Sequence, residues 1–368
     1  MKTAKSIEAQ KRQQSILINL LLAFICFAWT IPTLGLLISS FRTRDDIAKS
    51  GWWDVLPHRE WTTKETLDLG RGTPVDKPIN VKGDNVTDDE LRAGVMLSNG
   101  QQAKWDSRRA RTISIQEMRW AVNWNFTTDN YQNVLTGQQF KIKQADGTEK
   151  VEVGEDIGRS FLNTLTVSIP ATIIPILIAA FAAYAFAWMK FPLKKIMFAG
   201  IVALLVVPLQ TAMIPMLKDF KTMGIVGSFL SVWLAHTTFG LPLATYLLYN
   251  YISQLPGELF ESAAIDGASH FQIFRRLVLP LSVPALASFA IFQFLWVWND
   301  LLVALVYLGT DSAVATLPAR LNELVGTKGE SWHLLTAAAF VTMVVPLIVF
   351  LGLQRYFVRG LTTGSVKG

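Results

Sequence analysis

The sequence predicts an all-α integral membrane protein. Three observations favour this class: 51% of the 368 residues are hydrophobic, only 17% are charged, and the mean hydropathy is +0.33. The apolar residues are also gathered into long runs separated by polar stretches, as expected where lipid covers them. A soluble enzyme does not have this balance.

Six runs are near the ~20 residues that a helix needs to cross a bilayer. The predicted spans are residues 16–39, 161–188, 196–217, 229–249, 281–307 and 334–353. Basic residues precede the first run, as in a signal peptide, but this run is longer than the apolar part of such a peptide and no A-x-A cleavage site follows it. The first run is therefore interpreted as a retained span.

Prolines interrupt several of these runs. A proline inside a helix leaves one carbonyl without its amide donor, so the helices are expected to kink and their neighbours to satisfy the freed carbonyls. The prolines concerned are Pro170, Pro175, Pro208, Pro215, Pro242 and Pro346.

The short connections between the spans predict the orientation, because Lys and Arg accumulate on the cytoplasmic side of a membrane. They gather after the second, fourth and sixth spans, at Lys190, Lys194, Lys195, Arg275, Arg276, Arg355, Arg359 and Lys367. Both termini are therefore predicted to be cytoplasmic. The net charge of +6 follows from this topology, and no nucleic-acid partner is expected.

A long polar insertion, residues 42–158, separates the first two predicted spans and is expected on the outer side. It holds half of the twelve tryptophans, which indicates packed structure rather than disorder. Alternating apolar residues around Asp146-Gly147 predict a β-hairpin, those at Ile113 and Ile115 a strand, and residues 129–135 a short helix. Loops are expected over residues 62–107. The insertion is thus predicted to be a small α+β lobe.

Several kinds of catalytic and metal site are excluded by the sequence. Cys26 is the only cysteine and the four histidines form no HExxH pattern, which excludes a cysteine-ligated metal and an HExxH hydrolase. No GxxxxGK[ST] motif occurs, so ATP and Mg²⁺ are expected to be bound by another chain. A membrane-embedded enzyme would need a GxSxG motif or paired aspartates, which the spans lack.

The connection between the fourth and fifth spans, residues 251–280, is too long for a simple turn. Pro256 suits the first turn of a helix, and Glu258 and Glu261 complement the positive N-terminal end of that helix. Gly267 permits the left-handed conformation that ends a helix, with a close approach of two backbones expected there.

A second short helix is predicted directly after this glycine. Ser269 and Gln272 have the spacing of a capping box, and the helix is expected to run to Pro280 at the mouth of the fifth span. Two short helices joined at a glycine describe a knob at the membrane surface that fits the groove of a partner protein. The alternative is an amphipathic helix that lies on lipid, although its acidic first turn argues against an anionic membrane surface.

This connection resembles a known motif. Residues 261–267, with the sequence ESAAIDG, and Leu279-Pro280 are similar to the EAA loop of ABC importer permeases; Ser262 stands where alanine is usual. In that family the loop is the coupling helix that docks into the ATP-binding subunit. The resemblance therefore implies contacts with an ATPase at Glu258, Glu261, Ala263, Ala264, Asp266, Gly267 and Arg275.

Two further segments resemble the carbohydrate branch of this family, especially the maltose permease subunit of G type. Residues 183–192, AYAFAWMKFP, look like the family's AYAFAR-hydrophobic-FP, and residues 354–368 look like its closing QR-x-x-V-x-GLT-x-G-x-VKG. Such a tail is by itself typical of a frayed terminus, whereas the resemblance implies that it inserts between the ATPase subunits. The tail residues concerned are Gly360, Thr362, Gly364 and Lys367.

Aromatic and polar residues cluster in the outer part of the predicted span 281–307. Tryptophans there are typical of the interfacial belt, but an amide and a carboxylate at this depth favour a cavity or a partner helix. Aromatic, amide and carboxylate groups together suit a sugar, which offers C–H faces and hydroxyls. The predicted residues of a translocation path are Gln210, Trp296, Trp298, Asn299 and Asp300.

The resemblance implies a six-helix, type I ABC importer transmembrane domain in the bacterial cytoplasmic (inner) membrane. Besides lipid, the expected partners are a sister permease, a dimer of ATP-binding subunits and an extracytoplasmic sugar-binding protein. No cofactor is expected in this chain, which would be a transport subunit rather than an enzyme. The expected domains are residues 1–41 (N-terminus and first span), 42–158 (insertion), 159–355 (permease core) and 356–368 (tail).

The expected substrates are α-linked di- and oligosaccharides, because the long insertion is similar to that of α-glucoside permeases. The alternatives are a permease for a solute other than a sugar, an ion-coupled secondary transporter, and a receptor or assembly scaffold. A secondary transporter would need several ionisable groups at membrane depth, and only Asp300 is a clear candidate. A scaffold would leave the EAA-like loop unexplained.

Overall fold

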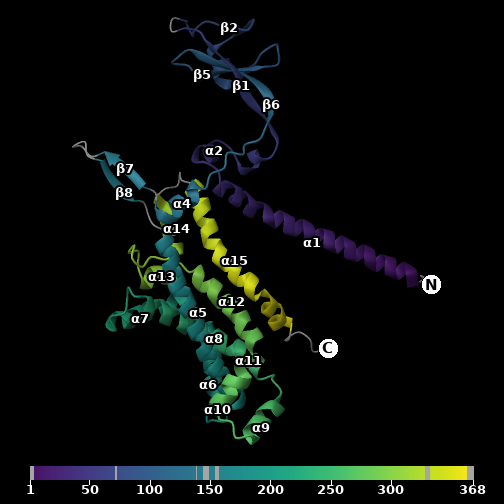
Figure 1. Cartoon of the computed structure of the whole chain (residues 1–368), viewed down its shortest axis with the longest axis vertical. Coiled ribbons are helices and arrows are strands. Elements are labelled where there is room, and N and C mark those ends of the chain that lie inside the picture. The colour runs from purple at the N-terminus through teal and green to yellow at the C-terminus, as the bar shows by residue number, and fades with distance from the viewer. Residues whose placement is uncertain are drawn as a thin grey trace. The chain divides into compact units, whose positions relative to one another are not determined.

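The computed structural model describes residues 4–70, 73–137, 139–143, 149–153, 157–327 and 332–362. The chain divides into two compact units (Figure 1). The first comprises Met1–Gly35 and Asp45–Phe126, and the second comprises Leu36–Arg44 and Thr127–Gly368. The long helix α1 (Ala4–Ser40) begins in the first unit and ends in the second.

A four-stranded antiparallel sheet with the strand order β1-β6-β5-β4 dominates the first unit. Its core is formed by buried aliphatic residues of the sheet, of the β2–β3 hairpin and of helix α3. The elements are α2 (Arg44–Lys49), η1 (Trp52–Val55), β1 (His58–Asp68), β2 (Ile79–Val81), β3 (Asp84–Val86), α3 (Asp88–Ala93), β4 (Val95–Met96), β5 (Gln102–Ser107) and β6 (Thr112–Ala121).

The strand predicted around Ile113 is confirmed as β6, but the prediction of loops over residues 62–107 is wrong. That stretch contains most of β1, all of β2 to β5, and α3. The β2–β3 turn consists of Lys82 and Gly83, both with positive φ (54° and 101°), which is the pair of conformations that matches the twist of a hairpin. These strands escaped prediction because β2, β3 and β4 have only two or three residues and β1 is mostly exposed.

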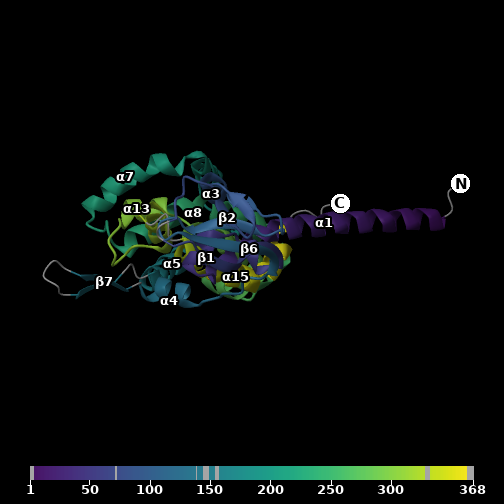
Figure 2. The ribbon, with the colours of Figure 1, turned by 90° about the horizontal axis from the view of Figure 1, so that it is seen from above.

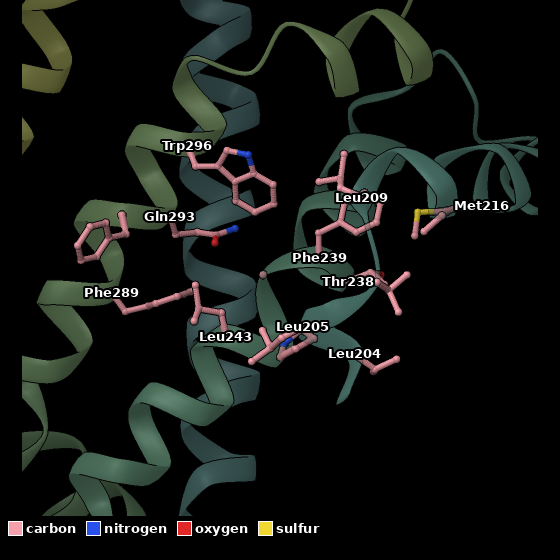
Figure 3. A pocket seen from close by; sticks show the side chains of 15 residues that line it. Leu204, Leu205, Leu209, Met216, Thr238, Phe239, Leu243, Phe289, Gln293 and Trp296 are labelled. Carbon is pink, nitrogen blue, oxygen red and sulfur yellow. The ribbon is translucent and has the colours of Figure 1, made fainter. Parts of the chain in front are cut away.

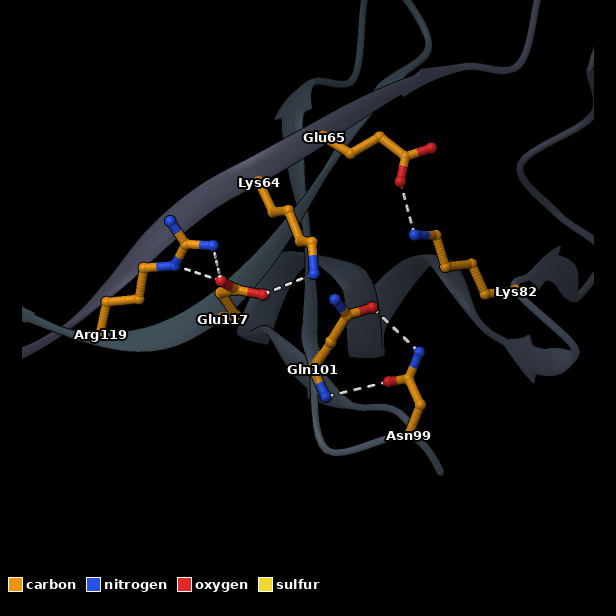
Figure 4. Close-up of polar contacts among 7 residues, drawn as sticks. All are labelled: Lys64, Glu65, Lys82, Asn99, Gln101, Glu117 and Arg119. Atoms are coloured by element: carbon orange, nitrogen blue, oxygen red, sulfur yellow. Dashed lines mark hydrogen bonds and ion pairs between the residues drawn. The ribbon is translucent and has the colours of Figure 1, made fainter.

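Several ion pairs lie on the exposed surface of this sheet and of the adjacent β2–β3 hairpin (Figure 4). Glu117 of β6 contacts Lys64 of β1 at 2.8 Å and also contacts Arg119, while Lys82 contacts Glu65 at 2.5 Å. The hydrogen bond from Lys64, helped by Arg119, holds the pKa of the Glu117 carboxyl below its usual value. Because these side chains are largely in contact with water, each pair contributes little to stability.

Asp88, the first residue of α3, joins this helix to the sheet. Its carboxylate accepts hydrogen bonds from Trp105 Nε1 at 3.1 Å and from Arg108 Nε at 3.0 Å, and it lies 2.9 Å from the guanidinium of Arg92. Partial desolvation acts to raise the pKa of Asp88, but the hydrogen bond and charge of Arg108 outweigh it and hold the pKa below its usual value. The ionised carboxylate is therefore favoured in the folded unit.

Acidification is expected to loosen α3 through Asp88. A carboxylate with a lowered pKa in the folded state contributes stability that is present above its unfolded pKa and is lost as the pH falls through its folded pKa. Hydrogen exchange of the α3 amides in the full-length protein, corrected for the intrinsic rate, should therefore show protection falling below about pH 4.

Two variants of neighbouring residues separate this effect from general acid sensitivity. Asp88→Asn should show lower protection at neutral pH and a flatter acid profile. Asp89→Asn should follow the wild type, because the Asp89 side chain is 93% exposed and its carboxylate lies 3.9 Å from Arg92, too far for a hydrogen bond. Identical profiles for the two variants would contradict the role of Asp88.

The second unit is helical apart from one hairpin. Helices α5, α8, α12 and α15 form a bundle (Figure 1), and α7 lies to one side of it (Figure 2). The elements are α4 (Asp129–Thr136), β7 (Gln139–Lys143), β8 (Glu149–Val153), α5 (Ile157–Trp188), α6 (Lys194–Ala203), η2 (Leu204–Val206), α7 (Leu209–Thr222), α8 (Phe229–Ile252), α9 (Gly257–Ile265), α10 (His270–Ile273), the π-helical segment η3 (Phe274–Val278), α11 (Leu279–Leu281), α12 (Val283–Trp298), α13 (Leu302–Tyr307), α14 (Leu317–Thr327) and α15 (Trp332–Thr362).

The short helix predicted at residues 129–135 is confirmed as α4, and the predicted hairpin as β7–β8. Its proposed turn, Asp146-Gly147, lies outside the described residues.

Three helices of the described chain are long and apolar enough to cross a membrane, and five spans result if each of two bent helix pairs counts as one. The single helices cover Lys11–Ser40, Ile157–Trp188 and Trp332–Tyr356. Helix α8 has 24 residues, enough to cross, but polar residues near its middle, including His236, lower its hydropathy. The chain has a sixth span only if α8 is counted as one because of its length.

The first bent pair confirms the kink predicted at Pro208, and the second bends at the start of the span predicted at residues 281–307. The first pair bends by 105° between η2 and α7, and the second by 73° between α11 and α12. Pro208 causes the first break, because the residue before a proline is driven into an extended conformation, and Val207 has ψ 118°. A further break after Trp298 separates α12 from α13.

The freed carbonyls are satisfied as predicted at three of the helix prolines. Pro346 of α15 has no N–H to donate to the carbonyl of Thr342, and the indole Nε1 of Trp298 in α12 donates to that oxygen instead at 3.0 Å. The same arrangement occurs twice on α5. Trp233 Nε1 of α8 donates to Thr166 O (2.9 Å), four residues before Pro170, and Gln293 Nε2 of α12 donates to Ala171 O (3.1 Å), four residues before Pro175.

These three side-chain donors link α8 to α5, α5 to α12, and α12 to α15. In lipid, an unsatisfied backbone carbonyl has no water to bind, so each donor removes a cost that its proline creates. The four helices of the bundle are therefore connected by polar clamps, in addition to apolar packing. We refer to these contacts as the proline clamps.

Candidate coupling loop and translocation site

The loop predicted to contact an ATPase folds as two short helices with a glycine between them. Helix α9 begins one residue after Pro256, and Glu258 lies in its first turn. It ends with Gly267 at φ +77°, where Gly267 N donates to Ala264 O at 3.1 Å and Ala268 N donates to Ala263 O at 3.0 Å. This pair of bonds is the Schellman motif that a left-handed glycine permits.

The predicted capping box after this glycine is confirmed. Ser269 Oγ accepts from Gln272 N at 3.4 Å, and Gln272 Oε1 accepts from Ser269 N at 2.8 Å. The chain continues as one turn of α10, the π-helical η3 and then α11, with Pro280 near the start of α11. Pro280 has no N–H to donate to the preceding turn. The π-helical segment η3, with its wider i to i+5 hydrogen bonds, lies directly before α11, which contains this proline.

Aromatic residues hold α9 and α10 against the end of α5. Phe260, which is buried, stacks on Trp188 with ring centroids 4.1 Å apart and an angle of 16°. Trp188 also donates from Nε1 to Ile252 O at 3.0 Å, and the hydroxyl of Tyr184 lies 2.9 Å from His270 Nδ1. The loop is thus fixed to α5 at both of its helices.

The outer surface of the loop presents an exposed, mostly acidic face. Glu258, Glu261, Asp266 and the apolar Ile265, which is 86% exposed, lie on it. Of the other predicted coupling residues, Ala264, Gly267 and Arg275 are exposed and Ala263 is half-buried. Sequence reasoning missed Ile265, although an apolar residue among acidic ones at a helix end was a signal.

One expectation for Gly267 is wrong for this chain. Among the residues that the structure describes, no heavy atom of a neighbouring segment lies within 4 Å of the position that a Cβ would occupy there. The left-handed backbone at this position requires a glycine. A close approach of a second backbone among the described residues is not the reason.

The C-terminal tail continues as helix further than expected. Helix α15 extends to Thr362, so the backbone of Gly360 and Thr362 is helical. Gly364 and Lys367 lie outside the described residues.

Four of the five predicted path residues come together in one pocket. Gln210, Trp296, Asn299 and Asp300 line it with three leucines, around a volume of about 460 Å³. Asp300 Oδ1 accepts from Val303 N at 2.9 Å and thereby caps α13. The second carboxylate oxygen lies 3.9 Å from Nε2 of His236 on α8, and the His236 ring packs edge-on against Trp296 at 5.1 Å.

Trp298 lies elsewhere. It is 1% exposed and packs against Phe161 at 5.8 Å and Phe294 at 5.5 Å, in addition to its clamp on α15. Two residues along a helix are about 200° apart around its axis, so Trp296 and Trp298 cannot share a face. The structure places Trp298 in the helix core.

A second cavity, of about 490 Å³, adjoins this pocket and shares Leu209 and Trp296 with it (Figure 3). It lies between α7, α8 and α12 and is mostly apolar. Gln293 brings an amide to its wall, one helical turn before Trp296. Sequence reasoning missed Gln293, although an amide in an otherwise apolar span is a signal of the same kind as Gln210.

A comparison with known protein families identifies the family of this chain. Residues 175–363, which contain the loop, both pockets and most of the bundle, match the family described as "Binding-protein-dependent transport system inner membrane component". The chain belongs to this family. It is therefore a permease subunit of an ABC importer, as its EAA-like loop suggested, and the expectations of a transport subunit and of an inner-membrane component are confirmed.

Relatives match the permease over nearly its whole length. The osmoprotective compounds uptake permease protein GgtD of Synechocystis sp. is 45% identical over 96% of this chain and 93% of its own. The alpha-glucoside transport system permease protein AglG of Rhizobium meliloti is 43% identical over 95% of this chain and 97% of its own. Both alignments include the residues of the insertion.

The fold is also similar to that of a solved permease. A chain of a bacterial ABC transporter involved in the import of the acidic polysaccharide alginate superposes with a TM-score of 0.61, covering 95% of this chain and 98% of that chain at 14% identity. The helical ABC permease fold predicted from the sequence is thereby confirmed.

The stack on Phe260 predicts a specific defect for this permease. Replacing Trp188 by alanine removes both the stack and the bond to Ile252, and aromatic pairs contribute about 0.5–1.5 kcal/mol beyond their buried area. We expect uptake per ATP hydrolysed to fall roughly three- to tenfold, measured in proteoliposomes of the assembled transporter. Trp188→Phe, which keeps a ring, should fall less. Unchanged coupling in Trp188→Ala would contradict a mechanical role, and Trp332→Ala, at an exposed tryptophan, is the matched control.

Proposed function

We propose that this chain is one of two permease subunits of an ATP-driven importer of α-glucosides. The observation that carries the proposal is the 43% identity to the alpha-glucoside permease over 95% of one chain and 97% of the other, which includes the long insertion. The transported sugar would pass the pocket of Gln210, Trp296, Asn299 and Asp300. An indole face with amide and carboxylate oxygens matches the C–H faces and hydroxyls of a pyranose.

A second candidate substrate is a small osmoprotective solute. It is supported by the 45% identity to the osmoprotective compounds permease. A mixed aromatic and carboxylate pocket also suits a quaternary ammonium solute through cation–π contact, so the pocket alone does not separate the two candidates.

The proposal includes the complete topology. Six spans would place both termini in the cytoplasm, with α8 as one of the spans and the insertion of residues 42–158 outside. The sister permease would complete the path, an extracytoplasmic binding protein would deliver the solute, and a dimer of ATPase subunits would bind ATP and Mg²⁺. The exposed face of α9, with Glu258, Glu261 and Ile265, would dock into the ATPase, and the tail after residue 356 would reach between the two ATPases.

The test is ATP hydrolysis by the assembled transporter in proteoliposomes. The chain would be combined with its sister permease, ATPase and binding protein, and maltose, sucrose, trehalose and glycine betaine would be compared. Stimulation by one or more of the glucosides supports the proposal, and stimulation by glycine betaine alone would favour the second candidate.

Two further outcomes would reject the proposed mechanism. Failure of any ATPase to associate with the chain would contradict the coupling role of α9. Uptake driven by an ion gradient without ATP would show an ion-coupled transporter instead.

A further inference from the structure

The side chain of Gln293 is held in one orientation by the bundle. It is 2% exposed, and its Nε2 donates to Ala171 O at 3.1 Å and to His236 O at 3.4 Å. The carbonyl of Ala171 needs this donor because Pro175 has no N–H. Since the nitrogen must face these two carbonyls, the amide oxygen must face the other way.

The amide oxygen of Gln293 faces space without a protein donor. No hydrogen bond reaches Gln293 Oε1 from any part of the chain that the structure describes, and Gln293 lines the cavity of about 490 Å³. The oxygen fits there because residue 240 is a glycine: an added Cβ at Gly240 would lie 2.7 Å from it. An acceptor in a cavity wall pairs with whatever fills the cavity, either water or a ligand.

The surroundings of this oxygen suit a sugar ring more than water alone. Trp296 lies one turn later on α12, and Phe289 one turn earlier, so aromatic rings flank the amide along the same wall (Figure 3). The break before Pro208 borders the cavity on the opposite side. At membrane depth, broken helices are tolerated where they line a cavity or are buried in protein, and they form the substrate sites of many transporters.

We propose that Gln293 Oε1 is the hydrogen-bond acceptor of a sugar subsite in this cavity, with Trp296 as its aromatic platform. The subsite rests on the proposed function and names a residue that selects its substrate. A pyranose hydroxyl donates to Oε1, its C–H face lies on the indole, and its next ring extends toward Asn299 and Asp300, because the two pockets share Trp296. A solute without a hydroxyl at this position leaves Oε1 unpaired and is rejected.

A single cysteine can report whether sugar occupies the cavity. Cys26 is the only cysteine of the chain, so Cys26→Ser provides a cysteine-free background. Thr238→Cys places a small thiol on an exposed, cavity-lining position of α8, and Leu247→Cys places one on the same helix at a position that does not line the cavity. In the assembled transporter with ATP and binding protein, maltose at saturation should slow maleimide labelling of Thr238→Cys roughly tenfold and leave Leu247→Cys unchanged.

The clamp geometry separates sugar binding from helix packing. Pro175→Ala restores a backbone N–H for Ala171 O, so that Gln293 is no longer needed to satisfy it. In this background Gln293→Leu removes the acceptor together with the 3.4 Å hydrogen bond to His236 O. The protection of Thr238→Cys by maltose should then be lost, whereas Pro175→Ala alone should keep it. The pair Pro346→Ala and Trp298→Phe changes an equivalent clamp away from the cavity and should also keep the protection.

The outcomes distinguish the subsite from the proposed function. If maltose stimulates ATP hydrolysis but gives no protection, or gives protection that survives loss of the Gln293 acceptor, the subsite is wrong and the α-glucoside function stands. If none of the glucosides stimulates the wild-type transporter, the proposed function fails and the subsite fails with it.

Discussion

Replacing Gly267 by aspartate is expected to abolish ATP-driven uptake while the subunit remains in the membrane. Gly267 has φ +77° and closes the Schellman motif that ends α9. A side chain in this conformation costs roughly 1–2 kcal/mol, which the chain can avoid by changing the turn between α9 and α10. The substitution also adds a carboxylate beside Asp266, on the face proposed to meet the ATPase.

The measurement is uptake in proteoliposomes, together with co-purification of the ATPase. Uptake should fall at least tenfold, equivalent to about 1.4 kcal/mol, with a weaker loss in Gly267→Asn, because asparagine adopts the left-handed conformation more readily. Gly224→Asp is the matched control: Gly224 has φ +72° but follows α7, away from the loop. Wild-type uptake in Gly267→Asp, or an equal loss in Gly224→Asp, would refute a specific role of this turn in coupling.

Replacing Trp298 by phenylalanine is expected to destabilise the helix bundle in a way that a second substitution reverses. The indole Nε1 is the donor that the carbonyl of Thr342 has in place of the amide of Pro346. Interhelical hydrogen bonds in membranes contribute about 0.6–2 kcal/mol, so Trp298→Phe should lose stability of this order plus a small packing term. Pro346→Ala restores the helix's own donor.

The two substitutions form a double-mutant cycle. Unfolding of the permease in mixed micelles by increasing SDS measures the stability of each variant. In the Pro346→Ala background, Trp298→Phe should cost clearly less than in the wild type, because the carbonyl no longer depends on the indole. Additive effects would show that the Trp298 clamp contributes only packing.

The coupling loop could be predicted from sequence because its structure is local. The left-handed turn at Gly267 and the capping box of Ser269 and Gln272 depend on residues within one turn of each other, so spacing alone indicates them. The anchoring of the loop could not be predicted in this way. The stack of Trp188 on Phe260 joins residues of different helices, and nothing in the local pattern pairs them.

The helix breaks and the buried position of Trp298 show a second limit of prediction from the sequence. Hydropathy predicts where lipid surrounds the chain but does not register a bend. Pro208 indicates the first break, whereas no proline precedes the break after Trp298, so residues 281–307 appeared as one continuous span. Trp296 and Trp298 are equally apolar, and only the helices packed around α12, among them α5 and α15, decide that one faces a pocket and the other the core. In the first unit, strands of two or three residues are too short to show an alternation.

The proline clamps also constrain how sequences of this kind can change over time. Losing Trp298 while Pro346 remains leaves the carbonyl of Thr342 unpaired. Losing Pro346 while Trp298 remains is tolerated, because a carbonyl oxygen can accept from the restored backbone amide and from the indole together. The order of change is therefore constrained in each pair, Pro170 with Trp233, Pro175 with Gln293, and Pro346 with Trp298. Among related permeases a donor without its proline is expected to occur, and a proline without its donor is the informative exception.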